Sequence, residues 1–315
     1  MSAADRLFIE NVKNILENGV SDENMEVRPV WEDDRSPAHT VALFGVVDRY
    51  DLSKEFPIMT LKRTFWKSAL DEIFWIWQKK SNNVHDLSSK VWDAWADEEG
   101  SIGKAYGYQM GVKSPYSDVK PEGLEKAFPD GKFTNNYTCY VSDKRGVISE
   151  KNERGLWKLD QTDRIIYQLV NDPGSRRIMS MMYAPADLSE MALAPCAYSM
   201  TFNVMDGKLN GMLNQRSQDM AVANSWNTVQ AALLVYAFAS AYGFEPGELV
   251  HVIANCHIYD RHIEPVKKLI ANPEHDAPKL IVNPEIHDFY DFTKDDFSLP
   301  GYEYSDFDYK FPVAV

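Results

Sequence analysis

The sequence is poor in cysteine, and its charge is strongly of one sign. Its 315 residues contain three cysteines, Cys139, Cys196 and Cys256, which is too few for a disulfide framework and indicates a reducing compartment. The formal net charge is −14, so no diffuse basic surface is available to hold nucleic acid or an anionic membrane. A phosphate site must therefore be a local cluster of arginines in an acidic protein.

Long hydrophobic runs are also missing. No stretch approaches the roughly 20 apolar residues of a transmembrane helix, and the first residues, MSAADRLFIENVKN, carry charges where a signal peptide has an apolar segment. We therefore expect a cytoplasmic protein. General motifs are absent too: the chain has no Gly-rich phosphate loop, no zinc-type Cys/His spacing and no Gly-x-Ser-x-Gly elbow. Its chemistry must be sought in single polar residues set in apolar segments.

What is present is an alternation of helix and strand patterns. Apolar spacing predicts helices over residues 5–18, 61–80, 161–174 and 226–243, and another from about residue 261. Strand patterns cover residues 40–50, 176–183, 197–204, 209–215 and 248–259. The turn MDGK could pair the strand over 197–204 with the strand over 209–215. Because there is no internal repeat and no linker, we expect one α+β domain over residues 1–315.

Residues 112–156 differ from the rest of the chain. They are polar and rich in turn residues, and their periodicity is poor apart from short runs. We interpret them as a surface insertion rather than a second domain.

A few residues stand out, each with a plain structural alternative. Cys196, in ALAPCAYSM, has surroundings typical of a small apolar filler. Arg176 and Arg177 open a strand, where paired arginines are commonly solvated. Glu72 is followed by five apolar residues, 73–77, which leave little room for a solvent-exposed helix face. This pattern favours a partly buried Glu72 carboxylate.

Other polar residues gather near the ends of apolar elements. Residues 215–219 (QRSQD) follow a strand pattern, and Asn227 starts a buried helix. His257 and Tyr259 alternate along a strand and so share a face, although a histidine beside Cys256 is more often a satisfied core residue. Spacing by itself does not decide among these interpretations.

Together these segments resemble the thymidylate synthase family nearly end to end. The matching segments, in the order of the family, are DRSPAHT, PIMTLKR, DEIFWIWQ, VWDAWADEEGSIGKAYG, NDPGSRRIM, MALAPC, GKLNGMLNQRSQDMA, HIYDRHIEP and the terminal PVAV. The unmatched region is mainly 112–156. The resemblance implies a single α+β domain with a mixed β-sheet flanked by helices, and a homodimer in which sheet packs against sheet.

The resemblance implies a nucleotide site for dUMP. Cys196 matches the nucleophile that adds to C6 of the pyrimidine, and Arg216 matches an arginine beside the sulfur that binds the phosphate and would lower the pKa of the thiol. Asn227 matches the residue that reads the uracil edge. The other residues implied for dUMP are Arg35, Gln215, Ser217, Asp219, His257, Tyr259 and, from the neighbouring subunit, Arg176 and Arg177.

The same resemblance implies a folate site and two proton-handling residues. Glu72 matches the glutamate that organises waters and moves protons, and Tyr106 matches a tyrosine implicated in removal of the C5 proton. Asp219 matches the carboxylate that binds the pterin. The other residues implied for the folate are Lys62, Trp92, Trp95, Trp226, Val313 and Ala314, the last two in the segment 313–315 that closes over the ternary complex.

The implied activity is that of a methyltransferase that converts dUMP to dTMP. The cosubstrate is 5,10-methylenetetrahydrofolate, which is consumed to dihydrofolate, and no metal is needed. The thiolate adds to C6, C5 attacks the folate methylene, loss of the C5 proton and of the folate leaves an exocyclic methylene, and hydride completes the methyl group. The implied partners are dUMP, reduced folate and a second copy of the chain, with neither nucleic acid nor membrane.

Three positions depart from the family pattern. Ala197 replaces the histidine that usually follows the nucleophile, residues 223–226 (ANSW) replace a Gly-x-Pro-Phe loop at the folate pocket, and Asn255 stands where aspartate is usual. Two alternatives therefore stay open at this point. One is a pyrimidine hydroxymethylase of the same superfamily, in which water takes the exocyclic methylene, and the other is a non-catalytic nucleotide- or RNA-binding protein on this fold.

Overall fold

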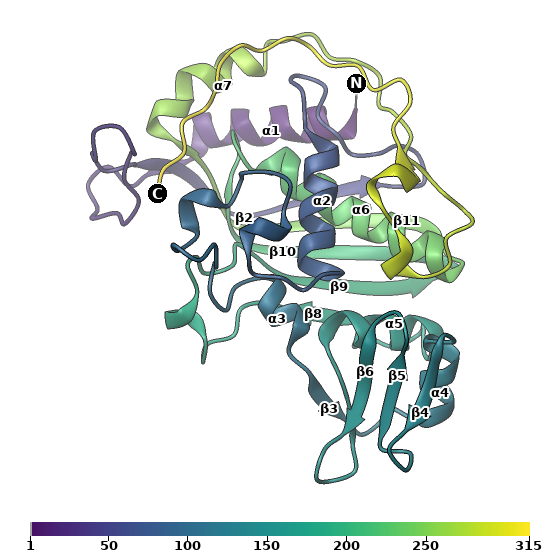
Figure 1. Ribbon diagram of the computed structural model, residues 1–315. Coiled ribbons are helices and arrows are strands. Elements are labelled where there is room, and N and C mark those ends of the chain that lie inside the picture. The colour runs from purple at the N-terminus through teal and green to yellow at the C-terminus, as the bar shows by residue number, and fades with distance from the viewer. Residues whose placement is uncertain (1) are drawn as a thin grey trace. The chain divides into compact units, whose positions relative to one another are not determined.

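The computed structural model describes residues 2–315, whose contacts group them into two compact units (Figure 1). Unit 1 contains the chain up to Leu70, the short segment Cys196–Tyr198 and Lys208–Val315. Unit 2 contains Asp71–Pro195 and Ser199–Gly207. Both units combine helices with β-sheet, which confirms the α+β class, while the single domain over residues 1–315 stays a prediction.

The sheet of unit 1 is mixed, as predicted. Its strands follow the order β1 (Val20–Ser21), β2 (Thr40–Asp51), β11 (Glu245–Tyr259) and β10 (Lys208–Asp219). The long strand β11 is parallel to β10 and antiparallel to β2. Along β2, Leu43 and Val46 both pack on the core, because Gly45 adopts a φ of +82° and switches the alternation of faces.

Helices of unit 1 pack on this sheet. Helix α1 (Ala3–Asn18) begins after Ser2, whose Oγ accepts a hydrogen bond from Asp5 N at 3.0 Å. Helix α6 (Asn224–Tyr242) is buried on nearly all sides, as its sequence predicted, and ends at Gly243 with a φ of +76°. A 3₁₀ turn (Asp260–His262) leads into α7 (Ile263–Leu269). The remaining chain forms a small hairpin, β12 (Ile281–Val282) with β13 (Phe297–Ser298), and extended segments.

Unit 2 holds a separate antiparallel sheet. Its order is β3 (Ser114–Tyr116), β7 (Trp157–Leu159), β6 (Gly146–Lys151), β5 (Cys139–Ser142) and β4 (Gly131–Thr134). Its helices are α3 (Gly107–Gly111), α4 (Pro121–Ala127) and α5 (Gln161–Asn171), and α2 (Trp66–Trp77) enters it from unit 1. Strand β8 (Met179–Met181) pairs with residues 199–201 of β9 (Ala197–Met205).

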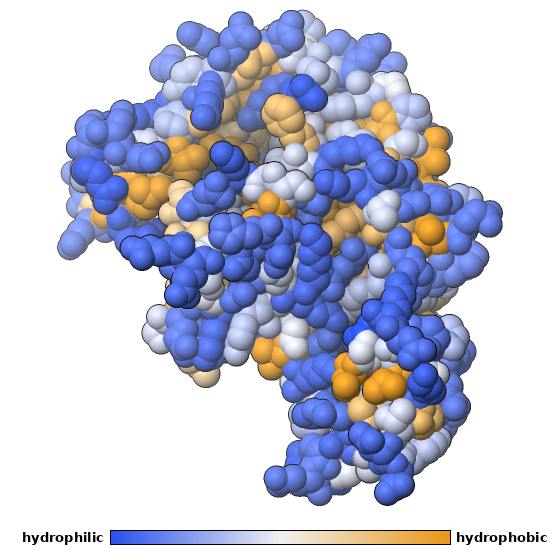
Figure 2. All heavy atoms as spheres, in the orientation of Figure 1, coloured by the Kyte–Doolittle hydropathy of each residue, from blue (hydrophilic) through white to orange (hydrophobic). Residues whose placement is uncertain are grey.

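Residues 112–156 therefore fold into four of the five strands of this sheet and helix α4. The strands are three to six residues long, too short for a clear period in the sequence. Phe133 joins them by ring contacts to Tyr137 at 4.0 Å, Tyr140 at 4.6 Å and Trp157 at 5.6 Å. Figure 2 shows a small apolar group on the mainly polar surface over β5 and β6. The role of these residues as an insertion stays a prediction.

In the part of the chain that the structure describes, no helix is both long and apolar enough to cross a bilayer.

Candidate active site

The candidate nucleophile lies at the start of a strand and opposite an arginine. Cys196 directly precedes β9, and its backbone oxygen accepts a hydrogen bond of 3.0 Å from Arg216 N on β10. The thiol is partly buried, and this burial raises its pKa, while the guanidinium groups of Arg216 and Arg28 act in the opposite direction. Arg216 therefore favours the thiolate as predicted, but burial outweighs both cations.

The loop that carries Arg35 is anchored from a distant part of unit 1. Arg35 has a φ of +58°, which is uncommon for a residue other than glycine. Arg261 holds its neighbours, with Nη1 2.9 Å from Asp33 Oδ1 and Nη2 2.6 Å from Asp34 Oδ2. Hydrogen bonds from Ser36 and then from Arg261 lower the pKa of Asp34 to about 2.

Asn227 lies in the first turn of α6, close to a residue of β10. Its Oδ1 is 3.4 Å from Gln215 Nε2, and its Nδ2 is 3.3 Å from Gln230 Oε1. Gln215 Nε2 also faces Ser217 O at 3.4 Å. Gln215 and Asn227, two of the residues implied for dUMP, are therefore in contact.

His257 and Tyr259 share a face of β11 as predicted. Their ring centroids are 5.0 Å apart, and His257 Nδ1 lies 2.8 Å from Asn255 Oδ1. A carboxamide oxygen can only accept, so the proton of the neutral His257 ring is on Nδ1 and Nε2 is left as an acceptor. Burial lowers the pKa of His257, which favours the neutral ring, and burial raises the pKa of Tyr259 to about 12.

Asp219 ends β10 with one carboxylate oxygen in use. Its Oδ1 accepts hydrogen bonds from Ala221 N at 2.9 Å and Val222 N at 3.3 Å, whereas Oδ2 accepts none among residues 2–315. Burial raises its pKa, but the His262 ring, the His257 ring and the Val222 N–H together lower it by more, and the net shift is downward. The carboxylate is therefore charged at neutral pH and open on one side.

Lys62 and the last residues of the chain lie in the same unit. Lys62 Nζ donates to Ala221 O at 2.8 Å and lies 4.8 Å from the centre of the Phe311 ring, and burial lowers its pKa to about 8. At the C-terminus, Val315 and Val30 exchange two backbone hydrogen bonds of 2.9 and 3.0 Å, and Ala314 pairs with Trp31. The terminal segment is thus held against the strand-like residues 30–31.

Unit 2 brings four of the predicted residues into one cluster. Glu72 is 6% exposed, and its Oε1 accepts a hydrogen bond of 3.0 Å from Trp92 Nε1, which confirms the inference that this glutamate is buried. The Trp92 ring lies 4.9 Å from that of Tyr106 and 5.6 Å from that of Trp95.

Tyr106 itself has a φ of +42°. The chain approaches Ser81 closely at the next residue, since a Cβ on Gly107 would lie 2.0 Å from Ser81 O. The position of the Tyr106 ring therefore depends on a glycine beside it.

Arg176 and Arg177 are exposed and make no ion pair among the described residues. They precede β8, where Ser175 Oγ accepts a hydrogen bond from Arg177 N at 3.3 Å. Both guanidinium groups are thus available to an anion outside the chain's own acidic residues.

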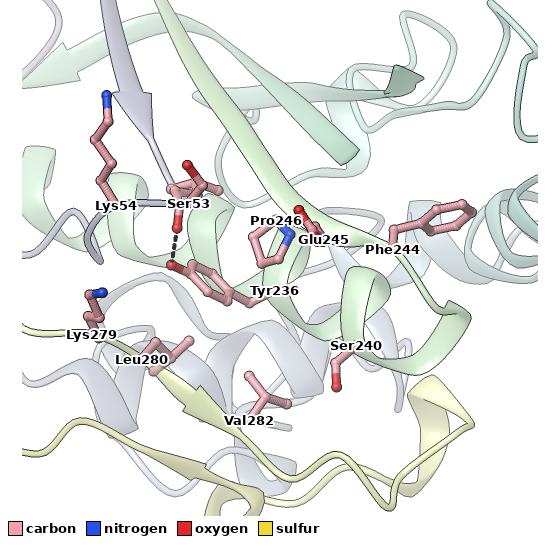
Figure 3. Close-up of a pocket in the computed structure, with 11 residues that line it drawn as sticks. Ser53, Lys54, Tyr236, Ser240, Phe244, Glu245, Pro246, Lys279, Leu280 and Val282 are labelled. Carbon is pink, nitrogen blue, oxygen red and sulfur yellow. Dashed lines mark hydrogen bonds between the residues drawn. The ribbon is translucent and has the colours of Figure 1, made fainter. Parts of the chain in front are cut away.

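A pocket of about 450 Å³ in unit 1 contains none of the predicted site residues. Tyr236 and Ser240 of α6, Lys279 and Leu280 are among the residues that line it, and Tyr236 Oη donates to Leu52 O (Figure 3). Among residues 2–315, no three His, Cys, Asp or Glu side chains are grouped as in a metal site.

Comparisons with known proteins agree over the whole chain. A model of the family described as thymidylate synthase matches residues 6–315. The chain belongs to the thymidylate synthase family. Thymidylate synthase 1 of Bacillus subtilis (strain 168) and the thymidylate synthase of Bacillus phage phi3T are each 38% identical to it over 318 residues, with all of both chains covered. The solved structure of thermostable thymidylate synthase A from Bacillus subtilis matches with a TM-score of 0.80 and 37% identity, over 99% of both chains.

Three residues of this thymidylate synthase family member were missed in the sequence. Arg28 acts electrostatically on Cys196 and Tyr259, His251 contacts Gln215, and His262 Nε2 donates to Pro312 O at 2.8 Å. No local pattern marks them, because each acquires its neighbour from a distant part of the chain. His262 does lie in the matching segment HIYDRHIEP, but the resemblance assigned it no role.

Proposed function

We propose that the chain is a thymidylate synthase that converts dUMP to dTMP. The observation that carries the proposal is Cys196, which is placed opposite Arg216 by the 3.0 Å backbone hydrogen bond in a chain whose family match covers residues 6–315. 5,10-Methylenetetrahydrofolate supplies the methylene group and the hydride. The three free cysteines, two of them buried, support a cytoplasmic location.

Cys196 acts as the nucleophile at C6 of the pyrimidine. The attacking species is the thiolate, and the thiol loses its proton against the cost of burial with the help of Arg216 and Arg28. Attack makes C5 nucleophilic and so prepares it to accept the one-carbon unit. Ala197 leaves this step without a histidine beside the sulfur, which makes the two arginines the charges that favour the thiolate.

The phosphate of dUMP is bound by arginines rather than by a glycine-rich loop. Arg216 and Arg35, together with Ser217, come from one subunit, and the exposed Arg176 and Arg177 come from the other. Guanidinium groups bind a phosphate dianion through paired, charge-assisted hydrogen bonds, which explains how a protein of net charge −14 binds a nucleotide.

Base and sugar are read by groups whose protonation the structure supports. Asn227 offers both an NH₂ group and a carbonyl to uracil. The His257 ring offers its Nε2 as an acceptor to the 3′-hydroxyl, since Asn255 holds its Nδ1–H, and Tyr259 stands beside it.

The residues implied for the folate fit a pterin. Asp219 is charged, and its Oδ2 accepts no hydrogen bond from residues 2–315. Such a carboxylate can accept hydrogen bonds from pterin nitrogens. Trp92, Trp95 and Trp226 supply aromatic surface, Lys62 lies beside Ala221 at the base of the terminal segment, and Val313 and Ala314 belong to the segment that covers the site.

Glu72 and Tyr106 handle protons. The Trp92 N–H holds one oxygen of the buried Glu72 carboxylate, so the carboxylate keeps one orientation while waters exchange at it. Tyr106 is the residue assigned to removal of the C5 proton.

The chain acts as a homodimer through the outer face of the unit 1 sheet. Phe44 is 91% exposed, Val47 52% and Met212 38%, and Val252, directly opposite Val47, lies on the same face. An apolar sheet face of this kind is typical of a protein interface. A dimer also explains why the exposed Arg176 and Arg177 form no ion pair among residues 2–315.

A covalent trap tests the proposed function. Incubation with dUMP and 5,10-methylenetetrahydrofolate should give dihydrofolate and a product with the mass of dTMP. 5-Fluoro-dUMP should form a covalent ternary complex, because fluorine at C5 does not leave as a proton does. Cys196→Ser should abolish the complex, and Cys139→Ser and Cys256→Ser should keep it. A hydroxymethyl product, or trapping that persists in Cys196→Ser, would contradict the proposal.

A further inference from the structure

Three side chains form a buried polar chain behind Asn227. Thr228 on α6 is 2% exposed, His251 on β11 is 0% exposed and Gln215 on β10 is 2% exposed. Thr228 Oγ1 lies 3.3 Å from His251 Nδ1, and His251 Nε2 contacts Gln215 Oε1. Gln215 Nε2 in turn faces Asn227 Oδ1 at 3.4 Å. The chain thus runs through three elements and ends on the residue assigned to the base.

The contacts from Ser217 to His251 fix which groups donate and which accept. The Ser217 carbonyl, 3.4 Å from Gln215 Nε2, can only accept, so the Gln215 amide nitrogen faces it and Oε1 faces His251. His251 must then donate from Nε2. Burial lowers the pKa of His251 to about 3, so the ring is neutral and Nδ1 is left as an acceptor that faces the Thr228 hydroxyl, which also contacts Tyr50.

This arrangement also orients Asn227. The Gln215 NH₂ group donates to Asn227 Oδ1, so the Asn227 amide nitrogen points the other way, to Gln230 Oε1 at 3.3 Å. An amide turned end over end would bring two NH₂ groups together at Gln215. That arrangement leaves the buried Gln215 donor without its acceptor, which costs free energy.

The orientation matters because an asparagine can match either pyrimidine. Uracil presents an acceptor at O4 and a donor at N3, whereas cytosine presents a donor at N4 and an acceptor at N3. One orientation of the Asn227 amide matches uracil, and the inverted one matches cytosine. The identity of the residue at 227 is therefore not sufficient for base selection.

We propose that His251 and Thr228 are positioning residues that select uracil over cytosine by fixing, through Gln215, the orientation of the Asn227 amide. The inference deepens the proposed function and rests on its assignment of Asn227 as the base reader. Neither residue touches the nucleotide. Their effect is on the ratio of two activities rather than on the reaction itself.

The test is the ratio of kcat/KM for dUMP to that for dCMP at saturating folate. His251→Phe removes both ring nitrogens at similar volume, and Thr228→Val removes the hydroxyl at constant shape. We expect the ratio to fall about tenfold or more in His251→Phe and several-fold in Thr228→Val, in line with the loss of one or two buried hydrogen bonds. His251→Gln, whose amide restores a donor to Gln215, and Thr228→Ser should keep the ratio within about threefold of wild type.

A matched control separates positioning from stability. Tyr236→Phe removes another buried hydrogen bond of α6, that to Leu52 O, and should lower Tm without changing the ratio. A merely structural role of His251 would lower both activities together. An unchanged ratio in His251→Phe and Thr228→Val would overturn the inference, and if His251→Phe does not fold, Thr228→Val decides.

Asn227→Asp separates the role of Asn227 as base reader from the positioning role of His251 and Thr228. An aspartate accepts from cytosine N4 and when protonated donates to N3, so this variant should shift the preference towards dCMP. If it does and the His251 and Thr228 variants do not, the inference alone fails. If Asn227→Asp leaves the preference unchanged, the assignment of Asn227 as base reader fails, and an absence of dTMP formation by the wild type contradicts the proposed function itself.

Discussion

Individual residues of the proposed site have an uncommon backbone conformation or a shifted pKa. Arg35 and Tyr106 both have positive φ, at +58° and +42°, although neither is a glycine. Such conformations cost free energy and persist where the surrounding structure enforces them. Cys196 has its thiol pKa raised by burial although two arginines lower it. At this scale the free protein keeps the proposed nucleophile, Cys196, largely protonated and the proposed phosphate ligand, Arg35, in a strained conformation.

The state of Cys196 gives a prediction for its alkylation. The rate of modification by iodoacetamide, followed at Cys196 by mass spectrometry, should rise with pH up to an apparent pKa above that of an ordinary cysteine. Arg216→Gln should raise this pKa further, because the charge that favours the thiolate is lost. A rise of about one unit slows the reaction roughly tenfold at neutral pH.

The control is Arg6→Gln, which changes an exposed arginine of α1 and should leave the rate at Cys196 unaltered. Cys256, whose pKa burial raises to about 12, should not react in the folded protein. An apparent pKa for Cys196 at or below the ordinary value would show that the arginines outweigh burial.

Among the elements, the loop of residues 31–36 shows how a site residue is positioned from a distance. Arg261, at the turn before α7, pairs with Asp33 and Asp34 and lies 4.8 Å from the centre of the Trp31 ring. Since the pKa of Asp34 is lowered to about 2, the stabilisation it contributes is present above the ordinary aspartate pKa and is lost only as the pH falls through about 2. The anchor is therefore intact throughout the neutral range.

Arg261→Ala should weaken dUMP binding. We expect KM for dUMP to rise about three- to tenfold with a smaller change in kcat, because Arg35 is released from its strained conformation while Cys196 is unchanged. The free energy of unfolding should change little, since exposed ion pairs contribute little. In steady-state kinetics, the ratio of KM for dUMP in Arg261→Ala to that in the wild type should stay constant from pH 6 to 9.

Lys267→Ala provides the comparison, because it removes an exposed ion pair of the adjacent helix, that with Glu264 at 2.7 Å, without touching the loop. It should leave KM for dUMP unaltered. An equal effect of the two substitutions, or an effect of Arg261→Ala on kcat alone, would contradict the proposed anchoring.

For the whole molecule, the outer face of the sheet and the paired arginines point to the same assembly. Phe44, Val47 and Met212 are exposed on one face, and Arg176 and Arg177 are exposed without an ion pair among residues 2–315. In a two-fold dimer each subunit gives the other the same residues. Two sites, each with arginines from both chains, then form only in the dimer.

Mixed dimers test this arrangement. Cys196→Ser chains and Arg176→Ala/Arg177→Ala chains should each be nearly inactive. After subunit exchange at equal concentrations, the mixture should regain about a quarter of wild-type activity, because half of the dimers are mixed and each has one intact site. Exchange is verified by mass spectrometry of the dimers, and a mixture that exchanges without gaining activity would count against shared sites.

Much of the fold was predictable from the sequence where the signal was local. The strand over 40–50 and the buried helix over 226–243 appear as β2 and α6, because their apolar residues repeat over ten or more positions. Residues 112–156 gave no such signal and yet form most of a sheet. Their strands are short. Strands β4, β5 and β6 pair with their neighbours in sequence, but β3 pairs with the distant β7, with Ser114 opposite Leu159, and the Phe133 ring contacts Trp157.

The sequence by itself determined the family and the α+β class, because the matching segments follow one another along the chain and the apolar patterns are local. Through that resemblance it also predicts the chemical groups of the site. It also predicted the burial of Glu72 from its five apolar neighbours. Only the tertiary structure decided which groups meet: Arg28 beside Cys196, Arg261 on the Arg35 loop, and His251 behind Gln215. It likewise decided the sign of the Cys196 pKa shift. Burial and electrostatic interactions depend on distances between atoms that lie far apart in the sequence, and those distances exist only once the chain has folded.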